Sequence, residues 1–272
     1  MNMNSIFDSR PAIAPKPGSK RAHVTIQNLQ KQFAGITLYE NFNLDIKKSK
    51  IVSVFGPNGC GKSTLINMVA GLMEIDSGQV LFNGKTLEQT KIGYVFQNYR
   101  DALFPWMTAW DNIAYPLKRL GMDKAQVQKR VEELIDLFEI KFNLKQYPYE
   151  HSGGQQQTTS IMRALACEPE VLFLDEPFSA LDFEMTLFIR EKLQETNLKT
   201  GVTMVIVSHD LEDAVFLADQ ILLLTRRPTK IAALLDFDMA RPRLAESVSA
   251  PEFIKIKAQA LQIFQREMHR PN

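Results

Sequence analysis

Two kinds of apolar pattern alternate along the chain. Apolar runs of strand length, broken only by Ser53, occur at residues 51–55, 171–174 and 204–207, and such runs are typical of strands buried on both faces of a parallel sheet. From about residue 22 to residue 96, shorter runs alternate with turns. The strands expected in this region cover residues 24–26, 42–46 and 79–82, and an Asn83-Gly84 turn follows the last of them.

Between these strands, the apolar residues take helical spacing. Residues 111–120 and 124–138 show it, the second with Val127, Val131, Leu134, Ile135 and Phe138 on one face. We therefore predict an α/β core interrupted by a helical insertion. The expected division is a leader at 1–21, core at 22–97, helical insertion at 98–165, core again at 166–240 and a helical tail at 241–272.

The two ends of the chain carry weaker patterns. Residues 1–21 contain several prolines and no apolar segment, so we expect a disordered leader and no signal peptide. From about Arg226 the tail is predicted to begin as a loop. It then ends in an amphipathic helix whose apolar face carries Phe253, Ile256, Ala260, Leu261, Phe264 and Met268.

Composition narrows the class of protein. A hydrophobic content of 45% and a charged content of 23% are ordinary for a soluble globular protein. The net charge of +1 gives no long-range reason to expect nucleic acid as a partner. Two cysteines are too few for a disulfide framework or a zinc site. No apolar run approaches the roughly 18–20 residues that span a bilayer, so we expect a soluble, cytoplasmic chain.

A phosphate-binding loop follows the first continuous apolar run. Residues 56–64 fit the pattern G-x-x-x-x-G-K-[ST], and residues 65–70 after them are predicted to form a helix that ends near Gly71. A glycine-rich turn that opens a helix aims backbone N–H groups and the positive helix end at one anion. The residues of this expected site are Gly56, Pro57, Asn58, Gly59, Cys60, Gly61, Lys62, Ser63 and Thr64.

The chemistry expected of this loop is phosphate and metal binding. Lys62 would reach the β- and γ-phosphates, and Ser63 would offer its hydroxyl to Mg²⁺. Cys60 lies inside the loop, where oxidation could block nucleotide binding. We favour a role for Cys60 as a small filling residue.

Two further segments carry chemistry. The apolar run at 171–174 ends in Asp175, which would lie beside Mg²⁺ near Ser63, and in Glu176, which would polarise an attacking water molecule as a general base. Upstream, Ser152-Gly153-Gly154 opens a predicted helix and forms a second candidate anion site by the same N-terminal logic.

With these motifs in order, the chain resembles the nucleotide-binding subunits of ATP-binding cassette (ABC) transporters from about Val24 to the tail. The resemblance implies a P-loop NTPase fold (RecA-like core) with an antiparallel β subdomain and an inserted α-helical subdomain. It also implies the following roles: Walker A at 56–64, the Q-loop glutamine at Gln97, the signature at Ser152, Gly153, Gly154 and Gln155, Walker B at Asp175 and Glu176, the D-loop with Asp182, the switch histidine at His209, and adenine stacking by Phe33.

The resemblance further implies a working arrangement. Two cassettes face each other head to tail around two ATP molecules with Mg²⁺, which Ser63, Gln97 and Asp175 would hold. Lys62, Gln97, Glu176 and His209 would take part in hydrolysis. Membrane permease subunits would contact the segment from Gln97 to Trp110, on the cytoplasmic face of the membrane, with a solute-binding protein in the complex.

Short segments resemble one branch of the family. Phe104-Pro105-Trp106, residues 227–231 and Arg241-Pro242-Arg243 look like bacterial importers for nitrate, sulfonate or taurine. The resemblance implies that no residue of the cassette touches the cargo, so the solute stays open. The sequence also leaves open whether the partner cassette is a second copy or a different chain.

The signature departs from the family pattern. His151 stands where leucine is usual, and Thr158 stands where arginine is usual. We expect His151 to pack at the helix start, and we take slow or partner-dependent hydrolysis as a hypothesis. Rival interpretations are a soluble ABC ATPase that works on ribosomes or DNA, an ATP-gated interaction subunit and, least favoured, a simple P-loop kinase.

Overall fold

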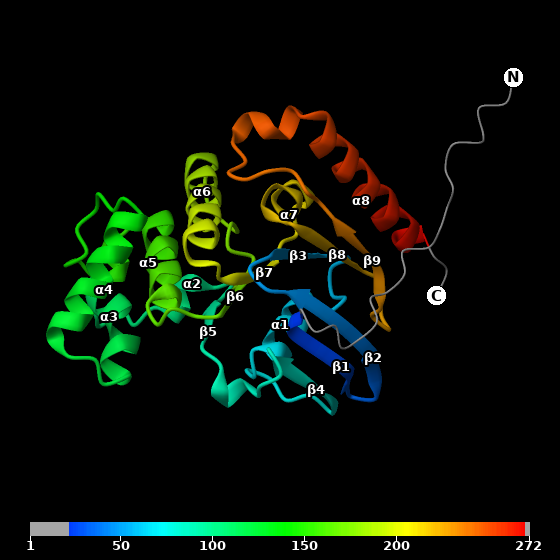
Figure 1. Cartoon of the computed structure of the whole chain (residues 1–272), viewed down its shortest axis with the longest axis horizontal. Coiled ribbons are helices and arrows are strands. Elements are labelled where there is room, and N and C mark those ends of the chain that lie inside the picture. The colour runs from blue at the N-terminus through cyan, green and yellow to red at the C-terminus, as the bar shows by residue number, and fades with distance from the viewer. Residues whose placement is uncertain (1–21, 270–272) are drawn as a thin grey trace, which may run out of the picture.

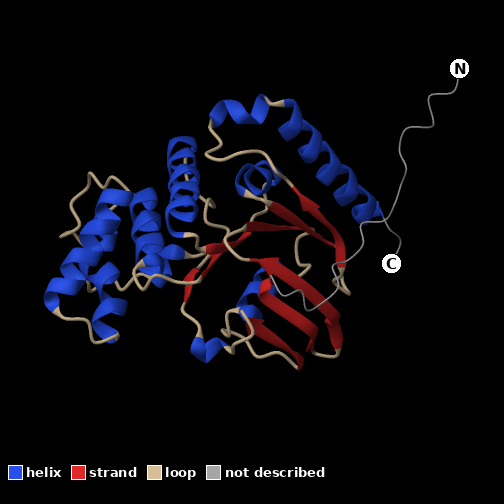
Figure 2. Cartoon of the chain, in the orientation of Figure 1, coloured by secondary structure: helices blue, strands red, loops and turns tan. Residues whose placement is uncertain are grey.

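A six-stranded sheet forms the centre of the molecule (Figures 1 and 2). The structure is a computed structural model and describes residues 22–269. The predicted leader at 1–21 lies outside the described residues. Five strands run parallel and the last is antiparallel to its neighbour. Their order is β5 (Ile92–Val95), β6 (Val171–Asp175), β7 (Thr203–Val207), β3 (Ile51–Phe55), β8 (Gln220–Leu224) and β9 (Ile231–Asp236). Every residue of β3, β6 and β7 is buried, as the continuous apolar runs predict.

A smaller antiparallel sheet covers one side of the core. Its strands, in the order β2-β1-β4, are β1 (Ala22–Phe33), β2 (Ile36–Lys47) and β4 (Ser77–Phe82). Helix α1 (Lys62–Val69) shares one buried cluster with this sheet and with β3, since Leu65 packs together with Ile26 and Val54. The phosphate-loop helix is therefore held between two sheets.

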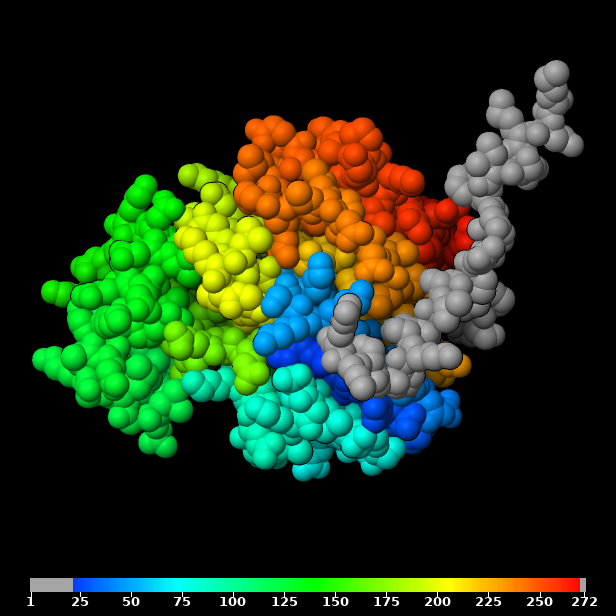
Figure 3. Space-filling view, viewed as in Figure 1, coloured from blue at the N-terminus to red at the C-terminus, as the bar shows by residue number. Residues whose placement is uncertain are grey.

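Helices cover the other face and one end of the central sheet. Along the face lie α6 (Phe183–Thr200), α7 (Leu211–Leu217) and α8 (Pro251–His269). The end of the molecule, green in Figures 1 and 3, is built from α3 (Ala109–Arg119), α4 (Lys124–Leu137) and α5 (Gly153–Leu165), which follow the short helix α2 (Tyr99–Ala102). The remaining helical turns are the short 3₁₀ segments η1 (Leu87–Gln89), η2 (Pro148–Glu150) and η3 (Ala245–Ser249).

These elements confirm the predicted α/β core with added helices. The pattern at 111–120 and 124–138 forms α3 and α4, and a capping box of Asp123 and Gln126 fixes where α4 begins. Asn83 and Gly84 both take positive φ, at 52° and 79°, as the predicted turn requires. Within residues 22–269, none of the helices combines the length and the apolar character that crossing a bilayer requires.

Residues 226–230 form the predicted loop and residues 251–269 the predicted final helix, but the tail differs from the prediction in two details. Residues 231–236 form strand β9, because pairing with β8 supplies the hydrogen bonds that the alanine-rich segment would not hold alone. Leu261 is 43% exposed, whereas Phe253, Ile256 and Ala260 of the same helix are buried. The buried face of α8 is therefore narrower than the sequence pattern suggests.

Because Phe253 is buried and Leu261 is exposed, replacing each with alanine should lower the free energy of unfolding by different amounts. Phe253→Ala removes a ring that is 1% exposed and packs edge-on against Phe237, so we expect a loss of about 3–5 kcal/mol in the free energy of unfolding. Leu261→Ala, the matched control on the same helix, should change it by about 0.5 kcal/mol or less. Urea unfolding followed by circular dichroism measures both, and equal losses would contradict the assigned face.

Candidate functional site

The phosphate loop takes a conformation that only glycine adopts easily. It joins the end of β3 to α1, and Gly59 and Gly61 have φ of +74° and +100°. A Cβ at Gly61 would also lie 3.0 Å from the side chain of Leu38. Gly61 is the residue that caps α1, so the first N–H groups of this helix open onto the loop. The loop is thus shaped as a cradle for an anion.

Side chains hold this cradle from both sides. Lys62 is buried and its ammonium donates to the carbonyls of Gly56 at 2.9 Å and Pro57 at 3.3 Å. From β2, the Tyr39 hydroxyl donates to the carbonyl of Gly61 at 3.0 Å. Cys60 is 1% exposed, and burial raises the pKa of its thiol, which fits a filling role.

The segment between β8 and β9 supports the loop as well. Arg227 Nε donates to the carbonyl of Gly59 at 2.6 Å, and Thr229 Oγ1 donates to the carbonyl of Cys60 at 2.5 Å. The sequence marked this segment only as a resemblance to one branch of the family. Because it lies about 170 residues after the loop, no local pattern could show the contact.

Ser63 and Asp175 meet at the end of the loop. Ser63 Oγ donates to Asp175 Oδ1 at 2.8 Å, as expected from their motifs. Asp175 is 5% exposed, and burial raises the pKa of its carboxyl group. A hydroxyl and a carboxylate are oxygen ligands of the kind Mg²⁺ prefers. The two residues therefore fit a Mg²⁺ ion beside the phosphate cradle.

Three predicted catalytic side chains converge next to this pair. Gln97 Nε2 donates to Glu176 Oε2 at 2.9 Å, and His209 Nδ1 lies 3.2 Å from the same oxygen. Glu176 has a φ of +47°, in the left-handed region, and its N–H donates to the carbonyl of Val207 at 3.0 Å. A non-glycine residue held in that region costs of order 1–3 kcal/mol. The fold therefore holds the backbone of Glu176 in a strained conformation, and this conformation sets where the carboxylate lies.

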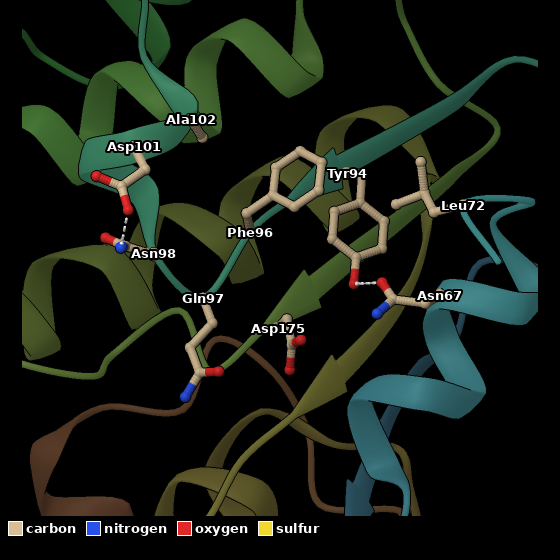
Figure 4. A pocket seen from close by; sticks show the side chains of 9 residues that line it. All are labelled: Asn67, Leu72, Tyr94, Phe96, Gln97, Asn98, Asp101, Ala102 and Asp175. Carbon is tan, nitrogen blue, oxygen red and sulfur yellow. Dashed lines mark hydrogen bonds between the residues drawn. The ribbon is translucent and has the colours of Figure 1, made fainter. Parts of the chain in front are cut away.

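A cavity opens beside Gln97 (Figure 4). It has a volume of about 650 Å³ and is lined by Asn67, Leu72, Tyr94, Phe96, Gln97, Asn98, Asp101, Ala102 and Asp175. The Tyr94 hydroxyl donates to Asn67 Oδ1 at 2.6 Å, which joins β5 to the phosphate-loop helix (Figure 4). Leu72 and Phe96 are 52% and 41% exposed. The cavity therefore runs from an apolar surface to the buried carboxylate of Asp175.

The signature residues lie at the start of α5. Ser152 and Gln155 form a capping box: Gln155 N–H donates to Ser152 Oγ at 3.3 Å, and Ser152 N–H donates to Gln155 Oε1 at 2.9 Å. A Cβ at Gly153 would lie 2.8 Å from the Tyr99 hydroxyl, and one at Gly154 would lie 2.6 Å from Met185. A side chain at either position would therefore force Tyr99 or Met185 to move.

Helix α5 belongs to the helical end of the molecule, whereas α1 lies between the sheets (Figure 1). The structure brings six of the predicted residues together at the carboxyl ends of the parallel strands, hereafter the sheet edge. They are Lys62, Ser63, Gln97, Asp175, Glu176 and His209. The structure leaves the signature residues at a separate helix start. The two candidate anion sites thus lie in different surroundings.

The altered signature residues are packed into the fold. His151 is 7% exposed, its Nε2 lies 3.1 Å from the carbonyl of Asn143, and its ring packs edge-on against Phe142. Thr158 is 1% exposed and its hydroxyl donates to the carbonyl of Gly154 at 2.8 Å. One link was missed from the sequence: Gln157 Nε2 donates at 2.7 Å to the carbonyl of Pro177, the residue after Glu176.

The two remaining predicted residues occupy element ends. Asp182 caps α6, where its Oδ1 accepts from the N–H of Met185 at 2.8 Å. Phe33 ends β1 and is 46% exposed, with the Lys31 ammonium 5.3 Å from its ring centre. The ring is accessible to a stacking partner, and its role stays a prediction.

Comparisons with known proteins place the chain in a family. A family model described as ABC transporter matches residues 39–179, just over half of the chain. The chain is similar to the sulfate/thiosulfate import ATP-binding protein CysA of Neisseria meningitidis, with 41% identity over 210 residues, which are 74% of this chain and 58% of that protein. It therefore spans well under two thirds of the length of that relative.

Another relative is covered almost fully. The aliphatic sulfonates import ATP-binding protein SsuB of Bacillus subtilis is 39% identical over 236 residues, which are 85% of this chain and 88% of that protein. Among solved structures, the dimeric post-hydrolysis state of the ATP-binding cassette MJ0796, bound to ADP and Pi, matches with a TM-score of 0.69 and 31% identity. That match covers 78% of this chain and 98% of the solved chain. The P-loop NTPase fold implied by the resemblance is confirmed, and the chain belongs to the ABC transporter family.

Proposed function

We propose that this chain is the ATP-hydrolysing subunit of an ABC importer. The observation that carries the proposal is the convergence of Gln97 and His209 on Glu176 at the sheet edge that also holds the phosphate loop. The ordering of these side chains suits a reaction in which water attacks the γ-phosphate of ATP. Most of the catalytic work in such a reaction is positioning and charge stabilisation.

Each side chain at the edge has a part in this proposal. The loop N–H groups and Lys62 bind the phosphates. Ser63 and Asp175, with Gln97 beside them, would hold Mg²⁺, which offsets phosphate charge when bound. Glu176 accepts the proton of the attacking water. Because both of its contacts use Oε2, Oε1 is left for that water. Adenine would stack on Phe33.

We further propose that two cassettes close on two ATP molecules. Helix α5 lies in the helical end of the molecule, apart from α1 and the phosphate loop (Figure 1), so Ser152 and the N–H groups of Gly153 and Gly154 at its start suit the γ-phosphate bound by a partner. The dimeric MJ0796 cassette, which shares the fold, supports this arrangement. Asp182 at the start of α6 would face the same interface. A second copy is the simplest partner.

The apolar surface around the Gln97 cavity suits a docked helix of a membrane permease. Leu72 and Phe96, which line the cavity, are 52% and 41% exposed, and Trp106, later in the same segment of the chain, is 70% exposed. Aromatic anchors are common where a helix enters a groove. In this proposal the segment from Gln97 to Trp110 contacts the permease at the cytoplasmic face of the membrane. A solute-binding protein would complete the complex.

For the solute, we propose a sulfur oxyanion of the sulfonate type. The support is the SsuB relative, which is covered over nearly its full length, together with the branch segments at residues 227–231 and 241–243. The comparisons give nitrate and taurine no specific support. In the proposal, the binding protein and the permease choose the solute.

Glu176→Gln should lower the rate of ATP hydrolysis by roughly 10²–10⁴-fold, because it removes the general base. ATP binding should persist, since no phosphate contact is lost. Steady-state phosphate release and equilibrium binding of labelled ATP measure the two effects. Glu246→Gln, an exposed change on η3, is the control and should hydrolyse at the parent rate. Unchanged hydrolysis in Glu176→Gln would refute the assigned base.

The dimer proposal predicts that Glu176→Gln protein becomes dimeric with ATP and Mg²⁺, with two nucleotides per dimer. In that background, Ser152→Asp should prevent the dimer, because its charge would repel the partner's γ-phosphate. Ser152→Asn should retain more of the dimer, because Asn and Asp cap a helix about equally well. Size-exclusion chromatography with counted nucleotide measures this. A parent that holds ATP yet stays monomeric would favour a different cassette as partner, or an ATP-gated subunit.

A further inference from the structure

Helix α7 connects the switch histidine to the C-terminal segment. It begins two residues after His209, and Asp210 Oδ1 caps its start by accepting from the N–H groups of Glu212 at 2.6 Å and Asp213 at 3.1 Å. The helix has seven residues, about two turns. A helix this short satisfies few of its own backbone groups, so its position depends on what binds its two ends.

Arg243 binds the other end of α7. Its Nη1 donates to the carbonyls of Val215 and Phe216 at 3.0 Å and of Ala218 at 2.8 Å, and its Nη2 donates to the carbonyl of Met239 at 2.9 Å. The side chain is 2% exposed, and its guanidinium lies 4.2 Å from the ring centre of Phe237. A cation at the C-terminal end of a helix is favoured by the helix dipole.

The charge of Arg243 is balanced by carbonyls and not by a contacting carboxylate. The nearby Asp219 bonds Arg241 instead, with Nη2–oxygen distances of 3.0 and 3.2 Å. Burial lowers the pKa of Arg243 to about 10, so the guanidinium stays charged at neutral pH. This arrangement explains the Arg241-Pro242-Arg243 segment, to which the proposed ATPase chemistry assigns no task.

The same segment is anchored to α6. Gln194, fully buried in that helix, donates from Nε2 to the carbonyl of Arg243 at 3.0 Å and accepts from its N–H at 2.7 Å. Helices α6 and α7 are joined directly as well, since Arg190 Nε donates to Asp213 Oδ1 at 2.8 Å and both side chains are buried. Helix α6 therefore holds Arg243 in place while its guanidinium binds the end of α7.

We propose that Arg243 is a positioning residue for His209: by holding the C-terminal carbonyls of α7, it sets where the His209 ring lies relative to Glu176. The proposal rests on the proposed ATPase function for its kinetic readout. It extends that function to a residue outside the ATPase motifs. If Arg243 acts through the position of the His209 ring, replacing Arg243 slows hydrolysis only in a protein that still has His209.

The test is a double-mutant cycle in the full chain. Arg243→Lys keeps the charge but cannot serve all the carbonyls, so we expect kcat to fall by about tenfold with KM for ATP unchanged. In the His209→Ala background, the same change should cost nothing further. Arg130→Lys is the matched control: Arg130 donates to the carbonyls of Leu165 and Ala166 at the end of α5, so its effect should be equal with and without His209.

A second readout does not need hydrolysis. The chain has four histidines, so the imidazole resonances of His209 can be assigned by comparison with His209→Ala. Arg243→Lys should shift the imidazole resonances of His209 and leave those of His151 unchanged. If the parent does not hydrolyse ATP, the proposed function fails, and this readout still decides the role of Arg243.

The proposal is overturned if Arg243→Lys slows the parent and the His209→Ala protein by the same factor, or if it changes neither the rate nor the His209 resonance. Should Arg243→Lys not fold, Gln194→Met takes its place in the cycle. That variant frees the same segment from α6 without removing the guanidinium, and the same two outcomes apply.

Discussion

Four functional segments reach one edge of the central sheet because β3, β5, β6 and β7 run parallel. Val207 pairs with both Val54 and Asp175, so the ends of three strands are level. The phosphate loop, Glu176 and the Ser208-His209 pair each follow one of these ends directly. Side chains alternate between faces along a strand, so a slip of one residue in β6 would turn Asp175 away from Ser63. The register is therefore as important as the motifs.

The sequence predicts this part of the molecule well because each motif is local. The loop, the two acids and the strands beneath them occupy short windows, and parallel strands buried on both faces leave a strong apolar pattern. Helix α6 leaves no such pattern and was not predicted. Its buried residues include Arg190, Lys192, Gln194, Thr196 and Asn197, so polar partners stabilise a helix that looks solvent-exposed in sequence.

Contacts between distant segments escaped prediction for a related reason. Arg227 on the loop carbonyl of Gly59 and Arg243 on the end of α7 lie in segments that the sequence marks only by resemblance to one branch of the family, which says nothing of these contacts. Their role depends on backbone carbonyls, which every residue carries and no sequence pattern marks. Strand β9 belongs to the same class, since β8 determines its conformation.

A common local device supports the functional segments. Ser152, Asp182 and Asp210 each cap the helix that follows a motif. A capped helix start fixes the backbone just before it, which is where the candidate site residues lie. Buried polar links then join these helices to each other and to the sheet, through Gln157 with Pro177 and through Arg190 with Asp213.

The left-handed backbone of Glu176 has a consequence for engineering and evolution. Glycine adopts a φ of +47° without the steric cost that glutamate bears there. A screen that selects only for heat resistance or expression would therefore favour Glu176→Gly. It would enrich variants that are more stable and lack the carboxylate. If Glu176 is the proposed general base, the residue needed for hydrolysis keeps the stability of this protein below what glycine at that position would give.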